Sequence, residues 1–141
     1  MARSDSFLDA LASVPLFAAC SRKELQLVEK QGEHRTVTAG TVLVSEGSVG
    51  AEFFVILDGK ARVERHGEKV ATLGPGSYFG ELSLLDRAPR NATVIAETDV
   101  ELVVLGQRAF DSLLDSIPKF DKKLLAGLAR RLRQEDLKTV Q

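Results

Sequence analysis

The middle of the chain constrains the fold most, because short strand-like segments alternate there with turn signals. Between residues 34 and 105, runs of β-branched and aromatic residues recur at residue 37 and at 41–44, 53–57, 61–63, 70–73, 93–95 and 100–105. Asp58-Gly59 is typical of a tight hairpin, and His66-Gly67 marks another turn. Short strands at this close, regular spacing predict an antiparallel barrel or sandwich.

Helical patterns flank this β region on both sides. In the N-terminal part, Pro15 interrupts a helical apolar repeat, and Ser21 with Glu24 forms a capping box that begins a second helix. Gly32 ends that helix. After residue 106 apolar residues again share one face, and Pro118 suits the first position of a final helix. We therefore predict a single mainly β domain over residues 1–141, with helices in 1–33, an antiparallel β core in 34–105 and C-terminal helices in 107–138.

Composition limits the cellular compartments and the kinds of chemistry that we expect for this protein. Cys20 is the only cysteine among 141 residues, so the chain cannot form an internal disulfide. The start lacks the apolar core of a secretory signal, and no apolar run is long enough for a membrane span. We expect a cytoplasmic protein that does not enter a membrane. The two histidines, His34 and His66, have no neighbours at metal-ligand spacing, so we expect no metal site and no catalytic residues. The chain is therefore not expected to be an enzyme.

Charge is unevenly distributed although the net charge is only −1. From residue 117 onward seven basic residues face three acidic ones, which makes this tail +4 and leaves the rest of the chain at −5. A basic helix can meet nucleic acid or an anionic surface, but a solvated helix face is the simpler interpretation. Too few residues follow the tail helix for a helix-turn-helix, so we expect no nucleic-acid partner.

The strand series is interrupted at residues 79–93. Gly80 is followed by Glu81 and several good helix formers, and Arg90 precedes the next strand. The first amides of a short helix favour an anion, and an arginine can bind phosphate oxygens with two parallel hydrogen bonds. A carboxylate repels phosphate but accepts hydrogen bonds from sugar hydroxyls. The stretch therefore suits a phosphate next to a sugar; the alternative is that Glu81 and Arg90 form a weak ion pair on the surface.

Two sequence motifs then resemble a known family. FGELSLL at 79–85 and APRNATV at 88–94 resemble the phosphate-binding cassette of the cyclic nucleotide-binding domain family, and the resemblance extends over about residues 8–135. That family includes regulatory subunits of cAMP-dependent kinase, nucleotide-gated channels and bacterial catabolite activators. The resemblance implies an antiparallel, jelly-roll-like β-roll with N-terminal helices, a short cassette helix and C-terminal lid helices. It also implies a nucleotide site made by Gly80, Glu81, Leu82, Ser83, Arg90, Asn91 and Ala92.

Roles within that site follow from the resemblance as well. It implies that Glu81 binds the ribose 2′-hydroxyl and Arg90 the cyclic phosphate, with help from main-chain amides of 80–83 and 91–92. Family members commonly close the C-terminal helix over the base, which corresponds here to residues 118–135. The side chains that we expect near the base are Leu125, Leu128, Arg131 and Leu132, and ordinary core packing is the alternative for the leucines.

Two questions stay open at this point: which cyclic nucleotide binds, and how the protein acts once it is bound. The residue after the arginine is often Ala in cAMP-binding members and Thr or Ser in cGMP-binding ones, whereas this chain has Asn91. We expect cAMP as the ligand, with cGMP as the alternative and with no other cofactor. The predicted function is a regulatory sensor in signal transduction that acts through movement of the C-terminal helix. The alternative is a degenerate, non-binding domain that forms a homodimer or contacts a partner protein through that helix.

Overall fold

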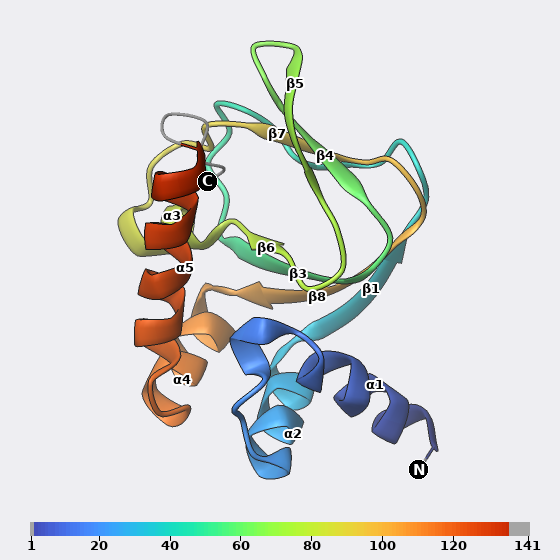
Figure 1. Cartoon of the computed structure of the whole chain (residues 1–141), viewed down its shortest axis with the longest axis vertical. Coiled ribbons are helices and arrows are strands. Elements are labelled where there is room, and N and C mark those ends of the chain that lie inside the picture. Colours follow the sequence, from blue (N-terminus) through green and yellow to red (C-terminus); the bar gives the residue numbers. More distant parts are fainter. Residues whose placement is uncertain (1, 136–141) are drawn as a thin grey trace.

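A computed structural model describes residues 2–135 as eight strands and six helical segments (Figure 1). The strands are β1 (Glu33–Val37), β2 (Val42–Val44), β3 (Glu52–Asp58), β4 (Ala61–Arg65), β5 (Glu68–Leu73), β6 (Tyr78–Phe79), β7 (Thr93–Ala96) and β8 (Val100–Gly106). The helices are α1 (Ala2–Ala12), the 3-10 helix η1 (Pro15–Phe17), α2 (Arg22–Gln31), α3 (Glu81–Asp86), α4 (Gln107–Ser116) and α5 (Phe120–Glu135). The predicted continuation of the last helix to residue 138 lies outside the described residues.

The strands form two antiparallel sheets of four strands each. One has the order β1-β8-β3-β6 and the other has the order β2-β7-β4-β5. The prediction of a mainly β roll with flanking helices is confirmed, but the two sheets do not close into a barrel, because no hydrogen-bonded strand pair among the described residues joins them. Figure 1 shows the sheets facing each other, with α1 and α2 below them and α3 to α5 along one side.

The two turn predictions had different outcomes. Asp58-Gly59 does not close a hairpin, because β3 and β4 belong to different sheets. Gly59 has a φ of +93°, and a Cβ atom there would collide with the carbonyl oxygen of Asp99. Glycine is therefore needed where the chain crosses between sheets. His66 and Gly67, with φ values of 56° and 82°, do join the paired strands β4 and β5, as the sequence predicted.

Helix ends follow the sequence signals in part. The capping box of α2 is present: the Glu24 amide donates to Ser21 Oγ, and the Ser21 amide donates to Glu24 Oε1. The prediction for Pro118 is wrong, since α5 begins at Phe120, after Lys119 in a left-handed conformation with φ of +65°. Within residues 2–135, no helix has the length and apolar character that crossing a membrane requires.

Strand β3 links two separate hydrophobic cores. Phe53 and Val55 pack in a core with the helices, whereas Phe54 and Ile56 pack in a second core between the sheets. Because side chains alternate along a strand, a strand buried on both faces reads as a continuous apolar run. This explains the sequence 53–56, which has no polar residue.

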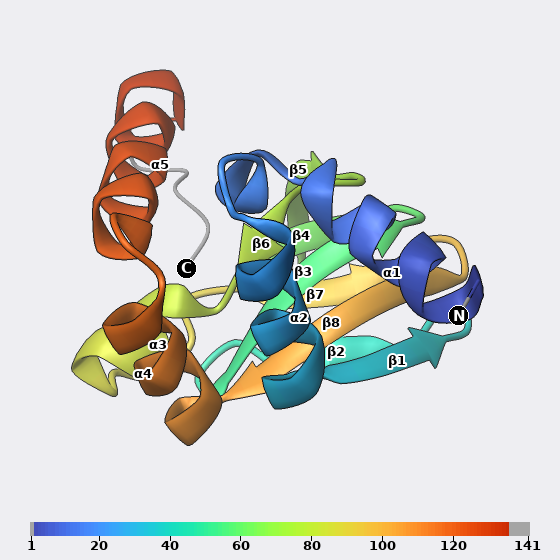
Figure 2. The ribbon, with the colours of Figure 1, turned by 90° about the horizontal axis from the view of Figure 1, so that it is seen from below.

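Helix α5 packs against the β6 side of the first sheet at a glycine. Figure 2 shows α5 projecting beside the strands, with its axis separate from those of α1 and α2. A Cβ atom at Gly127 would collide with the hydroxyl of Tyr78, whose ring packs against Phe53 at a centroid distance of 5.6 Å. A glycine inside a helix costs about 1 kcal/mol relative to alanine. The Tyr78 hydroxyl therefore gives a packing reason for a residue that weakens the isolated helix.

This packing predicts that Gly127→Ala will have opposite effects in two backgrounds. In the wild-type background, overpacking against Tyr78 costs about 1–3 kcal/mol, which cancels or exceeds the gain in helix propensity. In a Tyr78→Phe background the obstructing hydroxyl is gone, and Gly127→Ala should stabilise the protein by up to about 1 kcal/mol. Urea unfolding of the four proteins measures both effects. Equal effects in the two backgrounds would show that Tyr78 does not set the approach of α5.

Candidate functional site

Gly80 shapes the start of the interrupted segment. The chain must turn sharply between the end of β6 at Phe79 and the start of α3, and Gly80 does so with φ of +95°. A Cβ atom there would lie 2.6 Å from the carbonyl oxygen of Glu52 and 2.8 Å from Nη1 of Arg90. Both the left-handed conformation and the lack of space therefore require glycine at this position.

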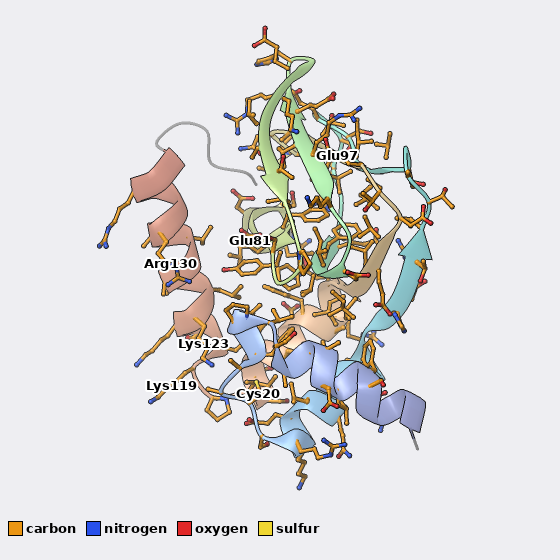
Figure 3. All side chains as sticks on the ribbon, turned by 45° about the vertical axis from the view of Figure 1, so that its right-hand side comes forward. Cys20, Glu81, Glu97, Lys119, Lys123 and Arg130 are labelled. Atoms are coloured by element: carbon orange, nitrogen blue, oxygen red, sulfur yellow. The ribbon has the colours of Figure 1, made fainter. Side chains whose placement is uncertain are left out.

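Glu81, the first residue of α3, is completely buried, with 0% of its surface exposed. Figure 3 shows its side chain between α5 and the strands. Ser83 is also buried, and its hydroxyl donates a 3.3 Å hydrogen bond to the carbonyl oxygen of Ala88, which ties α3 to the loop after it. The side chain of Leu82 lies outside the described part of the chain.

Arg90 is held by main-chain groups from three segments. Its side chain is 4% exposed, Nη2 donates to the carbonyl oxygen of Glu52 at 3.0 Å, and Nη1 donates to that of Gly80 at 3.5 Å. Its own backbone is clamped by the loop after β2: the Gly47 amide donates to the Arg90 carbonyl, and the Arg90 amide donates to the Ser48 carbonyl, both at 2.7 Å. Main-chain groups of the protein therefore fix the orientation of this guanidinium.

The buried guanidinium keeps its charge and one unused donor. Burial lowers the pKa of Arg90, and the carboxylates of Glu52 and Glu81 oppose that shift. Arginine remains protonated in proteins, so a permanent positive charge lies in this corner. Nε of Arg90 is buried and has no hydrogen-bond partner among the described residues. An anion that accepts from this nitrogen would satisfy a group that is otherwise costly to bury.

Burial also decides the alternative interpretation of the acid and the arginine. The alternative prediction, an exposed ion pair on the surface, is wrong because Glu81 and Arg90 are both buried. They lie close enough for the charge of Glu81 to act on Arg90. The structure thus brings Gly80, Glu81 and Arg90 together, from positions ten residues apart in the sequence.

The remaining predicted residues are placed differently. Ala92 is buried in the core between the sheets, just before β7. Asn91 is exposed, and its main-chain oxygen accepts a 3.2 Å hydrogen bond from Nε of Arg65. On α5, Leu125 is 62% exposed and Leu128 is partly buried. The side chains of Arg131 and Leu132 are not among those described.

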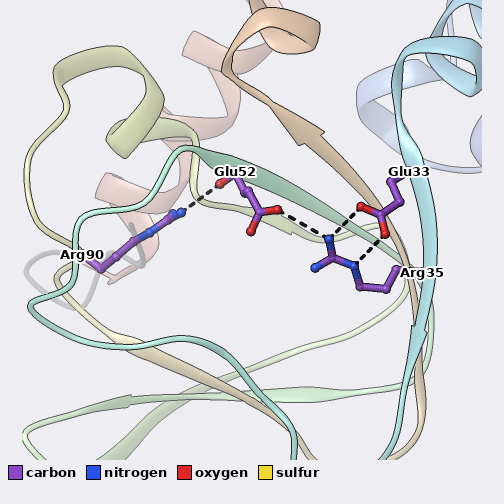
Figure 4. Close-up of polar contacts among 4 residues, drawn as sticks. All are labelled: Glu33, Arg35, Glu52 and Arg90. Carbon is purple, nitrogen blue, oxygen red and sulfur yellow. Dashed lines mark hydrogen bonds and ion pairs between the residues drawn. The ribbon is translucent and has the colours of Figure 1, made fainter.

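Three residues at this corner were missed by sequence reasoning. Glu52 supplies a carbonyl oxygen to Arg90, and its carboxylate forms a 3.5 Å ion pair with Nη2 of Arg35, as Figure 4 shows. A Cβ atom at Gly50 would collide with the Arg90 guanidinium. Gly50, in a loop that already contains Gly47, was a signal of close backbone approach that could have been recognised. No sequence signal marks a main-chain oxygen as the anchor of a distant arginine.

The corner combines three chemical features. It offers a fixed cation with a free donor, a buried carboxylate and a short helix start. Within residues 2–135, no group of three or more His, Cys, Asp and Glu side chains is arranged to hold a metal ion.

The chain matches the family model "Cyclic nucleotide-binding domain" over residues 34–116 and belongs to that family. This range contains the complete corner around Gly80, Glu81 and Arg90. The fold supports the same assignment, because the crystal structure of Thermus thermophilus catabolite activator protein is similar with a TM-score of 0.79. That likeness has 35% sequence identity and covers 88% of this chain and 61% of that one.

Similar curated proteins are regulators. The cyclic AMP receptor protein of Thermus thermophilus is 34% identical over 128 residues, which are 87% of this chain and 59% of that protein. The cAMP-dependent protein kinase regulatory subunit of Hypocrea atroviridis is 33% identical over 138 residues, which are 98% of this chain and 28% of that protein. The chain thus spans between about a quarter and three fifths of the length of these two relatives.

Proposed function

We propose that this chain is a cyclic AMP sensor that binds the nucleotide in the corner formed by Gly80, Glu81 and Arg90. The observation that carries the proposal is the buried Arg90 guanidinium, which is preset by main-chain oxygens and keeps a buried Nε without a described partner. A cation prepared in this way, beside a completely buried carboxylate, fits a ligand that joins an anion to a hydroxyl group.

Each part of the nucleotide has a proposed contact. Arg90 binds the cyclic phosphate, assisted by main-chain amides of 80–83 and of Asn91 and Ala92. Glu81 accepts a hydrogen bond from the ribose 2′-hydroxyl, at a distance from the phosphate that avoids repulsion between the two anions. No bond is made or broken in this scheme, so the proposed role of residues 1–141 is binding and not catalysis.

Cyclic AMP is proposed over cyclic GMP because both relatives described above carry cyclic AMP in their names. The residue after the arginine gives no clear preference, since Asn91 is exposed rather than directed into a core. A direct comparison of the two nucleotides is therefore part of the first experiment below.

We propose that Leu84 transmits the effect of nucleotide binding from the site to α5. This residue of α3 is buried in the same core cluster as Phe120 and Leu124 of α5. Leu85, in contrast, is exposed and is not proposed to take part. A ligand that orders residues 79–93 can therefore change the packing of α5, provided that it binds more tightly to one arrangement of α5 than to the other.

A second candidate function is an interaction module in which α5 contacts another copy or a partner. The observation that favours it is Leu125, which is 62% exposed on a helix whose other face is buried. This function is compatible with sensing, and it stands alone if the pocket binds no nucleotide. Light scattering distinguishes the cases: a dimer that shows no thermal shift with any cyclic nucleotide supports the interaction module alone.

Isothermal titration calorimetry with cAMP and cGMP tests the site directly. Wild type should bind cAMP in the submicromolar to low-micromolar range and more tightly than cGMP, and Arg90→Ala should lose binding because the phosphate loses its buried cation. Arg108→Ala, at an exposed position of α4, is the matched control and should bind like wild type. Equal titrations of wild type and Arg90→Ala would contradict the proposed site.

The role of Glu81 predicts an interaction between a variant and an analogue. For wild type, 2′-deoxy-cAMP should bind about tenfold or more weakly than cAMP, because a hydrogen bond to a buried carboxylate is lost. In Glu81→Gln the two nucleotides should differ much less, since the charged acceptor is already gone. The ratio of the four dissociation constants measures this coupling. An unchanged ratio in Glu81→Gln would place the 2′-hydroxyl elsewhere.

Hydrogen exchange tests the transmission through Leu84. Addition of cAMP to wild type should change the exchange rates of α5 amides. Leu84→Ala, which truncates the α3 member of the core that also contains Phe120 and Leu124, should bind cAMP but transmit a smaller change to α5. The result is counted only if Leu84→Ala still binds the nucleotide by calorimetry. An α5 response of wild-type size in that variant would rule out this route.

A further inference from the structure

A second arginine, Arg35, contacts the residue whose carbonyl oxygen anchors Arg90. Glu52 begins β3 and serves two partners: its carbonyl oxygen accepts from Nη2 of Arg90 at 3.0 Å, and its carboxylate lies 3.5 Å from Nη2 of Arg35 (Figure 4). Arg35 belongs to β1, which is separated from β3 by β8. The two arginines therefore hold the backbone and the side chain of one residue from opposite directions.

Arg35 reaches Glu52 diagonally across β8. Glu52 is paired with Gly106 at the end of β8, whereas Arg35 is paired with Leu102. These two positions on β8 are four residues apart, so the Arg35 side chain extends along the strand as well as across it to come within 3.5 Å of Glu52. Arg35 is also fixed on its own strand, because its Nε and Nη2 donate to Glu33 at 3.3 Å and 2.8 Å. Two hydrogen bonds to one carboxylate orient the guanidinium plane, so that Nη2 also faces Glu52.

The Glu52 carboxylate is a potential competitor for the Arg90 charge. Its side chain is 46% exposed, so it is not locked by packing, and its negative charge already acts on Arg90. If this carboxylate turned toward Arg90, it would accept from the nitrogen that the structure leaves without a described partner. An incoming phosphate would then have to displace it.

We propose that Arg35 is a positioning residue that holds the Glu52 carboxylate on the β1 side and so keeps Arg90 open for the nucleotide phosphate. The inference rests on the proposed function, but it assigns a role to a residue outside the cassette. It also assigns opposite roles to the two halves of Glu52: the main chain prepares Arg90, while the side chain must be kept away from it.

Replacing Arg35 should weaken cAMP binding, and removing the competitor should restore it. We expect Arg35→Gln to raise the dissociation constant about two- to fivefold, the size that a half-exposed ion pair allows. The double variant Arg35→Gln/Glu52→Gln should return to within about twofold of wild type, because the neutral amide introduced on β3 does not compete as an anion and the Arg90 anchor is a main-chain oxygen. Calorimetry at one ionic strength measures all the affinities.

Two matched controls separate positioning from the general loss of a positive charge. Glu33→Gln leaves the charge of Arg35 but removes the carboxylate that orients it, so affinity should fall, although by less than in Arg35→Gln. Arg62→Gln removes another arginine that pairs with a glutamate, Glu64 on β4, and it should bind like wild type. If Arg35→Gln and the double variant lose the same affinity, Arg35 acts only through its charge and the proposal is overturned.

A measurement on the nucleotide-free protein tests the tether itself, which is the contact between Arg35 and the Glu52 carboxylate. The ¹⁵N resonance of Arg90 Nε, assigned by its loss in Arg90→Lys, should shift in ligand-free Arg35→Gln and return in the double variant. An unmoved resonance together with wild-type affinity overturns the positioning role while leaving the proposed function intact. A wild-type protein that binds no cyclic nucleotide overturns the proposed function, and an unmoved resonance in that case overturns the tether as well.

Discussion

The burial of one guanidinium is the constraint on which this corner of the molecule depends. A charged arginine can be buried only where carbonyl oxygens and carboxylates compensate it. Here Gly80 and Glu52 supply the oxygens, the loop after β2 clamps the backbone of Arg90, and the missing side chain of Gly50 leaves room for the guanidinium. Gly80 and Gly50 are thus consequences of one packing problem.

The two cores connect this corner to the rest of the fold. Strand β3 begins at Glu52 and then alternates its side chains between the core of the helices and the core between the sheets. Leu84 joins α3 to the first of these cores, and Ala92 joins the end of the segment to the second. The residues flanking Arg90 are therefore packed into both layers.

Sequence reasoning succeeded where the chemistry is local and failed where it is not. The capping box of α2, the His66-Gly67 turn and the strands were readable because short-range contacts determine them. The Asp58-Gly59 signal was misleading, because a tight turn looks the same whether the chain returns along its own sheet or crosses to another. In the site, Gly80, Glu81 and Arg90 were recognisable by residue type. Glu52 and Arg35 were not, because a main-chain oxygen has no residue signature and the Arg35 contact depends on the register of three strands.

The anchoring of Arg90 by a main-chain oxygen has a consequence for how this domain can vary. Every residue type at position 52 carries the same carbonyl group, so a mutation there exchanges only the side chain beside the proposed phosphate site. Under the proposed function, variation at this one position adjusts nucleotide affinity in small steps, while the main-chain contact that orients Arg90 stays the same. At this position the main-chain oxygen, which orients Arg90, does not depend on the side chain, which mutation can change.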